Sequence, residues 1–121
     1  MNLDVRQFRR FEKQIVLKKI GIKGQKKILN SKVLIIGIGG LGCPLLTYLA
    51  ASGVGNIGIV DQDKVELSNL NRQTLFVAED IGKFKVIQAK KYINKVNKKI
   101  KVKIFKTKIS LSNIKSIIKD F

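Results

Sequence analysis

Three short apolar segments along the chain have the pattern of β-strands. Val33–Ile36 is apolar at every position, which is typical of a parallel strand that is buried on both faces. Asn56–Val60 is a second short apolar segment, and in a third segment Val102 and Ile104 alternate with lysines. Because lysines on a strand usually mark the edge of a sheet, we expect the third strand to be an edge strand.

Apolar residues at helical spacing predict helices between and after these strands. A helix is expected after the first strand and should end at Gly53, because glycine readily adopts the left-handed conformation that closes a helix. A second helix is expected over Lys83–Lys99, and Ser112 could cap a last helix with an apolar stripe along one side. The stripe consists of Ile114, Ile117, Ile118 and Phe121.

The alternation of strands and helices predicts an α/β fold, namely a Rossmann-like parallel sheet with helices on both faces. Residues 1–30 should form an N-terminal helical arm, with a short helix near Gln25–Leu29. Residues 31–121 should form a nucleotide-binding α/β domain. A helix over residues 114–121 would normally lead into a fourth parallel strand beside the first. The domain is therefore expected to be incomplete, ending before that fourth strand.

A glycine-rich turn follows the first strand. Gly37, Gly39 and Gly42 match the pattern G-x-G-x-x-G, and Gly40 adds a further glycine. Such glycines allow a tight turn, a close approach of the backbone to a phosphate, and close packing of helix on strand. Asp61 ends the second strand, where nucleotide sites commonly place an acid that binds ribose hydroxyls. The pattern predicts a nucleotide site without saying which nucleotide.

Polar side chains suited to phosphate groups come after this acid. Asp63 is the first, followed by Asn69, Arg72, Gln73 and Lys85. If the segment is helical, Asn69, Arg72 and Gln73 share one face, because they are spaced i, i+3 and i+4. Arg72 offers a planar fork of donors, and Lys85 offers a point charge. Such groups suit nucleotidyl transfer, which must offset the charge of a triphosphate, better than they suit hydride transfer.

Composition excludes several kinds of site. The 121 residues contain no histidine and one cysteine, Cys43. This excludes histidine chemistry, an internal disulfide and a zinc site built from several cysteines. With no histidine to activate it, Cys43 is expected to be a packing residue. No apolar segment is long enough to span a membrane and the N-terminus is polar, so a cytoplasmic location is predicted.

The net charge of +17 raises the question of nucleic-acid binding. Lysine accounts for all but four of the 25 basic residues. The lysines are spread over many segments and lack the interleaved aromatic residues that stack on bases. An AT-rich genome would produce the same lysine-rich composition. We therefore do not expect nucleic acid to be the main partner.

The segment from about Arg10 to Phe121 resembles the opening half of the ThiF/MoeB family, bacterial relatives of ubiquitin-activating enzymes. The resemblance rests on the combined motif GxGGLG…DxDxVExSNLxRQ…GxxK, which is far more specific than the glycines alone. It implies an ATP- and magnesium-dependent adenylyltransferase that acts as a homodimer. The implied substrate is the C-terminal glycine carboxylate of a ubiquitin-like sulfur-carrier protein of the ThiS/MoaD type. The implied pathway is thiamine or molybdopterin biosynthesis.

The resemblance also implies roles for individual residues. Arg72 and Lys85 would be catalytic. The cofactor contacts would come from Gly37, Gly39, Gly40, Gly42, Asp61, Asp63, Asn69, Arg72, Gln73 and Lys85. Lys13 stands where the family has an arginine that reaches ATP across the homodimer, and it keeps the charge without the bidentate fork. The family's magnesium-binding aspartate and any zinc cysteines come later in the chain, so no metal ligand is expected here. The 121 residues alone are expected to be inactive.

Three other functions remain open at this point. An NAD-dependent oxidoreductase could use the same glycine turn, although it would have no reason to carry the SNLNRQ segment at residues 68–73. A tRNA-modifying dehydratase of the same superfamily would fit the basic composition. A non-catalytic module that binds a nucleotide or a carrier protein would fit the lack of the magnesium aspartate.

Overall fold

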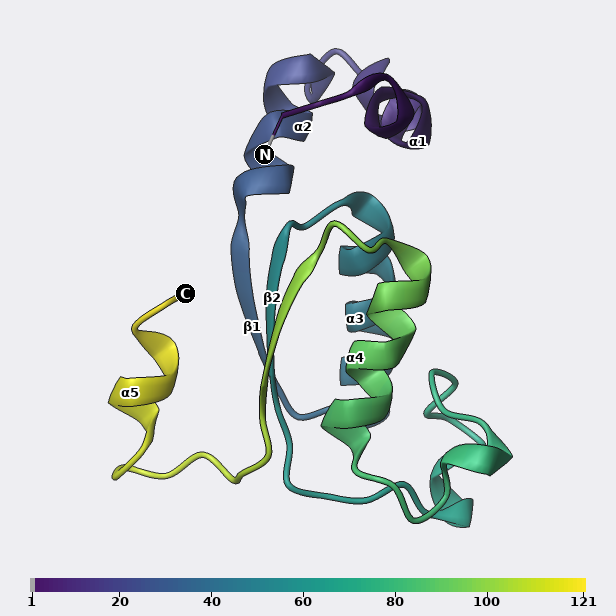
Figure 1. Ribbon diagram of the computed structural model, residues 1–121, viewed down its shortest axis with the longest axis vertical. Helices are drawn as coiled ribbons and strands as arrows, with labels where there is room; N and C mark the ends of the chain where they lie inside the picture. The colour runs from purple at the N-terminus through teal and green to yellow at the C-terminus, as the bar shows by residue number, and fades with distance from the viewer. Residues whose placement is uncertain (1) are drawn as a thin grey trace.

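The computed structural model describes residues 2–121 and shows a three-stranded parallel sheet with helices on both faces (Figure 1). The α-helices are α1 (Val5–Ile15), α2 (Gly21–Asn30), α3 (Gly42–Ser52), α4 (Lys85–Val96) and α5 (Ile114–Ile118). The strands are β1 (Lys32–Ile36), β2 (Asn56–Val60) and β3 (Lys101–Phe105). Two short 3-10 helices, η1 (Leu67–Asn69) and η2 (Ala78–Asp80), lie between β2 and α4. No helix in residues 2–121 has the length and apolar character needed to cross a bilayer.

The strands run parallel in the order β1-β2-β3, which confirms the predicted Rossmann-like sheet. Ile36 pairs with Val60, and Val60 pairs with Phe105, so all three strands end level with one another. β3 is an edge strand with exposed lysines, as the alternation of Val102 and Ile104 predicts. The loops that leave the carboxyl ends of the strands therefore begin at one edge, where open α/β sheets bind their ligands.

The helices divide between the two faces of the sheet. α3 and α4 cover one face, and α5 lies on the other (Figure 1). The main core is formed where α3 and α4 meet the sheet, and its fully buried side chains include Leu46, Ile57, Ile59, Val86, Ala89 and Ile93. Burying one such aliphatic side chain contributes about 1.5–3 kcal/mol. On the α5 side, the Phe121 ring packs against Gly58 of β2 so closely that a Cβ there would lie 2.3 Å from Cζ.

The two N-terminal helices lie at the amino end of the sheet (Figure 1). Phe11 of α1 is buried against Gly53, which has a φ of 97° and ends α3 as predicted. The side-chain amides of Gln14 and Gln25 both donate to the carbonyl oxygen of Ser52, at 3.1 and 3.0 Å. The last carbonyls of a helix have no partner within the helix, so these bonds satisfy one of them. The helices of residues 1–30 are thus packed onto the end of α3.

The helix predicted over Lys83–Lys99 is shorter in the structure, where α4 lacks residues at both ends of that range. It begins at Lys85 because Phe84 has an extended backbone, and it ends at Val96 because Asn97 is also extended. The apolar spacing reaches beyond the helix because Ile100, which directly precedes β3, is buried in the same core. Hydrophobic periodicity therefore overestimated the helix by counting a core residue that follows it.

Two expectations about α5 are wrong. Ser112 does not cap the helix, because the residue before α5 is Asn113 and its side chain makes no capping bond either. The Ser112 hydroxyl instead lies 2.8 Å from the hydroxyl of Ser110. Ile118, expected in the apolar stripe, is 45% exposed, whereas Ile117 is buried. A helix of five residues is too short to bury a four-residue stripe completely.

Candidate functional site

The glycine turn connects β1 to α3 at the carboxyl edge of the sheet. Gly37 has a φ of 93°, a conformation that glycine adopts without the cost of a Cβ clash. A Cβ on Gly42 would lie only 2.1 Å from the carbonyl oxygen of Gly37. Gly42 is also the first residue of α3, so its lack of a side chain lets the helix start directly against the turn. These two glycines therefore shape the turn itself.

Asp61 fastens this turn to the end of β2. Its Oδ2 accepts a hydrogen bond of 2.8 Å from the backbone N–H of Ile38, and its Oδ1 accepts one of 2.7 Å from the N–H of Asp63. The carboxylate therefore has a structural role that the sequence analysis did not anticipate. Each carboxylate oxygen has a second lone pair, so a ribose hydroxyl could still donate to it.

Arg72 and Gln73 lie over the two middle glycines of the turn. A Cβ on Gly40 would lie 3.7 Å from the Cγ and Cδ atoms of Arg72, and a Cβ on Gly39 would lie 3.8 Å from Nε2 of Gln73. The Arg72 Nη1 donates 3.0 Å bonds to the Ser68 carbonyl and to Oδ1 of Asn71, which fix the side chain in place. The structure thus brings together two motif segments that are thirty residues apart in the sequence.

The segment before Arg72 is not an α-helix, so the expected shared face is not formed. Asn69 ends the 3-10 helix η1, and its Oδ1 accepts a 2.8 Å bond from the N–H of Glu66. Asn69 and Gln73 are buried while Arg72 is exposed. Asn69 therefore stabilises the turn that presents Arg72 and Gln73. The side-chain oxygen of Asn69 is used in this turn, whereas its side-chain N–H₂ group makes no hydrogen bond within residues 2–121.

Lys85 is the first residue of α4 and is only 6% exposed. Its backbone N–H donates a 3.0 Å bond to the carbonyl of Asp63, which attaches α4 to the loop after β2. Neither of the two ion pairs in residues 2–121 includes Lys85. Most of the Lys85 side chain is buried and its ammonium group has no carboxylate partner within residues 2–121, so an anionic ligand could pair with it.

Cys43 lies near both Asp61 and Lys85, and its thiol is fully buried. Burial raises the pKa of the Cys43 thiol, and the nearby Asp61 carboxylate raises it further. A hydrogen bond from the Leu75 backbone and the charge of Lys85 lower it. A thiol with a raised pKa stays protonated near neutral pH and is a poor nucleophile. The burial and the direction of the shift agree with the expected packing role.

Two neighbouring hollows lie beside the turn. The larger, about 470 Å³, runs from Leu34 past the four glycines to Leu45. The smaller, about 170 Å³, extends from Asp61 to the segment after β3, and both hollows touch Ile36 and Gly37. The smaller hollow is also lined by Thr107, Lys108 and Ile109, which the sequence analysis missed. Their position just after β3, at the same edge of the sheet, was the signal that could have found them.

Lys13 is not part of this group. It lies on α1, at the amino end of the sheet, whereas the glycine turn lies at the carboxyl end (Figure 1). Any contact between Lys13 and a nucleotide at the turn would therefore have to come from another subunit.

The described residues do not form a metal site. No group of three or more Asp, Glu or Cys side chains in residues 2–121 is placed to hold an ion. Both oxygens of Asp61 already accept backbone hydrogen bonds, and Asp63 is exposed. Mg²⁺ bound with a nucleotide takes most of its oxygen ligands from phosphates and water, and these two carboxylates alone do not form a site for it.

The chain is similar to known proteins in sequence and in structure. It is 43% identical over 121 residues to the adenylyltransferase and sulfurtransferase UBA4 of Scheffersomyces stipitis, which covers 99% of this chain and 27% of UBA4. E. coli MccB, solved with ATP, is 37% identical with a TM-score of 0.74, over 77% of this chain and 28% of MccB. E. coli tRNA N6-threonylcarbamoyladenosine dehydratase, TcdA, has the same fold, with a TM-score of 0.90 at 24% identity, over 96% of this chain and 48% of TcdA.

These similarities agree with the motif and with the fold. The chain spans about a quarter of the length of UBA4 and of MccB. A model described as the ThiF family matches residues 11–121, nearly the whole sequence. The chain therefore belongs to the ThiF family.

Proposed function

We propose that the glycine-turn edge of the sheet binds ATP and that the protein uses it to adenylate a carboxylate. One observation carries this proposal. Arg72 and Gln73 lie over Gly40 and Gly39, so a guanidinium and an amide Nε2 are placed beside a stretch of backbone that carries no side chains. Donors arranged along open backbone suit the oxygen atoms of a phosphate chain.

The charges around the turn support a triphosphate rather than a neutral ligand. Arg72 lies over Gly40, and Lys85 is buried at the start of α4 without a carboxylate partner. The N-terminus of α3 adds the positive end of a helix dipole, although its first turn has few free donors, because the Cys43 N–H donates to the Gly39 carbonyl at 3.0 Å and Pro44 has no N–H. We place the ribose at Asp61 in the smaller hollow and the phosphates along Gly39 and Gly40 in the larger one. Gly37 and Gly42 act on the shape of the turn.

The proposed reaction is displacement at the α-phosphate of ATP. An oxygen of the substrate carboxylate forms a bond to the α-phosphorus, the bond to the bridging oxygen breaks, and pyrophosphate leaves with that electron pair. The nucleophile is already ionised at neutral pH, so no general base is needed. This suits a chain without histidine. Arg72 and Lys85 would stabilise the negative charge on the transferring phosphates.

The proposed substrate is the C-terminal glycine carboxylate of a ubiquitin-like sulfur-carrier protein. UBA4, which is 43% identical over this chain, is named an adenylyltransferase and sulfurtransferase, and this supports adenylation coupled to sulfur transfer. Thiamine and molybdopterin biosynthesis remain equal candidates for the pathway, and the cytoplasm is the proposed location. A homodimer is proposed as well, since Lys13 could reach a nucleotide only from a second subunit.

A tRNA-modifying dehydratase is the second candidate. TcdA has the same fold at 24% identity, and this chain carries a net charge of +17. That reading also requires ATP to be bound at the glycine turn. The two candidates differ in the carboxylate that is activated, which is a protein C-terminus in one and a group on RNA in the other.

The adenylation proposal is tested by ATP–pyrophosphate exchange with the protein expressed at its natural length. We expect exchange of labelled pyrophosphate into ATP when a ubiquitin-like carrier ending in Gly-Gly is added. A carrier that lacks its last glycine is the matched control and should give no exchange. Exchange that depends on tRNA instead of the carrier would favour the dehydratase. Absence of exchange with either would refute adenylation.

A further inference from the structure

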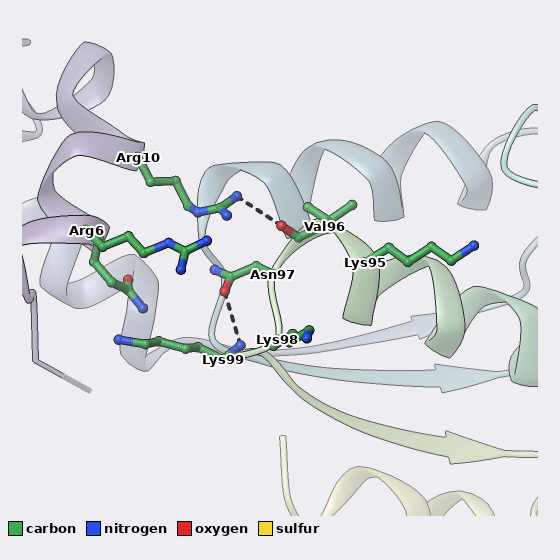
Figure 2. A pocket seen from close by; sticks show the side chains of 8 residues that line it. Arg6, Arg10, Lys95, Val96, Asn97, Lys98 and Lys99 are labelled. Atoms are coloured by element: carbon green, nitrogen blue, oxygen red, sulfur yellow. Dashed lines mark hydrogen bonds between the residues drawn. The ribbon is translucent and has the colours of Figure 1, made fainter.

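A further hollow, rich in basic side chains, lies at the amino end of the sheet, far from the glycine turn. It has a volume of about 280 Å³, and it lies between α1 and the turn that joins α4 to β3 (Figure 2). We call it the basic hollow and define it by its lining residues, Arg6, Gln7, Arg10, Lys95, Val96, Asn97, Lys98 and Lys99. The site proposed for ATP uses none of these residues.

The walls of the basic hollow are held by hydrogen bonds between its own elements. Nη1 of Arg10 donates a 3.0 Å bond to the carbonyl of Val96, which ties α1 to the end of α4 (Figure 2). The buried Asn97 accepts a 3.1 Å bond at its side-chain oxygen from the N–H of Lys99. Asn97 also donates its own N–H to Ile93, at 2.9 Å. These bonds tie α1 to the end of α4 and fix the shape of the turn that follows.

Positive charge in this hollow is largely uncompensated. Five of its lining residues are cationic, namely Arg6, Arg10, Lys95, Lys98 and Lys99. Only Lys99 has a carboxylate partner, Asp4, and the other ion pair in residues 2–121 lies at Lys103 and Asp120. Figure 2 shows the Lys95 side chain directed away from the other cations, so Arg6, Arg10 and Lys98 remain as the charges without a carboxylate partner around the hollow. Like charges brought together without counterions repel one another, so the arrangement favours an anion.

Helix electrostatics explain only part of this cluster. Lys95 lies in the last turn of α4, and Arg10 binds a carbonyl there, so both suit the negative end of that helix. Arg6 does not fit this explanation, because it lies in the first turn of α1, at the positive end of the α1 dipole. Arg6 and Lys98 are both exposed at the hollow, and an anion bound there would offset their charge.

We propose that the basic hollow is a second anion site that binds phosphate groups. A terminal phosphate group carries close to two negative charges and three acceptor oxygens near neutral pH, and a nucleic-acid backbone presents a row of singly charged phosphates, whereas a carboxylate carries one charge. The guanidinium groups of Arg6 and Arg10, with Lys98 beside them, match such a dense array of phosphate oxygens better than a lone carboxylate. The phosphates could belong to a small polyphosphate or to a nucleic-acid backbone. No aromatic side chain lines the hollow, so its lining offers no surface on which bases could stack.

The test uses charge reversal at the two cations that local structure does not explain. The Arg6→Glu/Lys98→Glu variant is compared with Lys18→Glu/Lys23→Glu, which changes the net charge equally at exposed positions outside the hollow. The probes are inorganic tripolyphosphate, a mixed-sequence RNA duplex of about 20 base pairs, and polyglutamate. Binding is measured at several salt concentrations. ATP binding is measured on every variant.

We expect the hollow variant to weaken tripolyphosphate binding at least tenfold, with less than a twofold change in the control and unchanged ATP binding in both. A parallel loss of RNA binding, with a smaller slope against salt, identifies a nucleic-acid backbone as the source. Unchanged RNA binding identifies a small polyphosphate. Equal losses in both variants, or polyglutamate binding as tight as tripolyphosphate, would overturn the proposal. If the glutamate variant unfolds, Arg6→Gln/Lys98→Gln gives the same comparison.

Discussion

Replacing Gly42 with alanine should destabilise the chain by about 3 kcal/mol or more, because the new methyl group has no space. The alanine Cβ would lie 2.1 Å from the carbonyl oxygen of Gly37 and 3.0 Å from its carbonyl carbon. Both are backbone atoms, so relief requires α3 to move away from the turn. Such a loss is a large fraction of the 5–15 kcal/mol that stabilises a typical domain. Chemical denaturation of the 121-residue chain measures it.

Gly39→Ala and Gly40→Ala are the matched controls for this substitution. Their Cβ atoms would make ordinary contacts, 3.8 Å from Gln73 and 3.7 Å from Arg72. Both variants should therefore keep nearly the unaltered stability, while ATP binding weakens if the phosphates approach the backbone at these residues. A Gly42→Ala variant as stable as the two controls would show that the close packing of α3 on the turn is wrong.

Arg72→Ala should lower pyrophosphate exchange by about 10²–10³-fold, which corresponds to roughly 2.7–4 kcal/mol of transition-state stabilisation. The expected loss is large because Arg72 lies over Gly40, where the phosphates are placed, and because its Nη1 bonds hold the guanidinium in position. The fold should be unaffected, since Arg72 is exposed. The measurement is exchange by the protein at its natural length, with thermal unfolding followed in parallel.

Arg9→Ala serves as the matched control for this loss, because Arg9 is an exposed arginine on α1, far from the turn. It should leave exchange unchanged. If Arg72→Ala retains exchange within about threefold of the unaltered protein, Arg72 is not part of the site. If both variants lose exchange equally, the effect comes from net charge.

The sheet and the turn could be predicted because each depends on local sequence. Val33–Ile36 forms a parallel strand as predicted, although it is an edge strand whose Ile36 is 56% exposed rather than a strand buried on both faces. Gly53 ends a helix, and Gly37 and Gly42 meet the steric demands of the turn. The alternating lysines of β3 correctly predicted an edge strand. These features follow from backbone conformation and from the burial of neighbouring residues, which short patterns record directly.

Long-range placement could not be predicted from spacing. Asn69, Arg72 and Gln73 were expected on one face, but the chain turns instead, so that Asn69 supports the loop and Gln73 is buried. Nor does spacing show that Lys85 is buried, since the chain is rich in lysine. The basic hollow depends on packing α1 against the end of α4, two elements about eighty residues apart. Such contacts are set by the tertiary fold.

Calorimetric titration with ATP and with NAD tests the proposed site most directly. The protein at its natural length is titrated with each nucleotide in the presence of magnesium. The proposal predicts that ATP binds more tightly than NAD, and that Gln73→Leu, which removes the amide beside Gly39, weakens ATP binding. Tighter binding of NAD, with ATP binding unaffected by Gln73→Leu, would contradict an ATP site at the glycine turn.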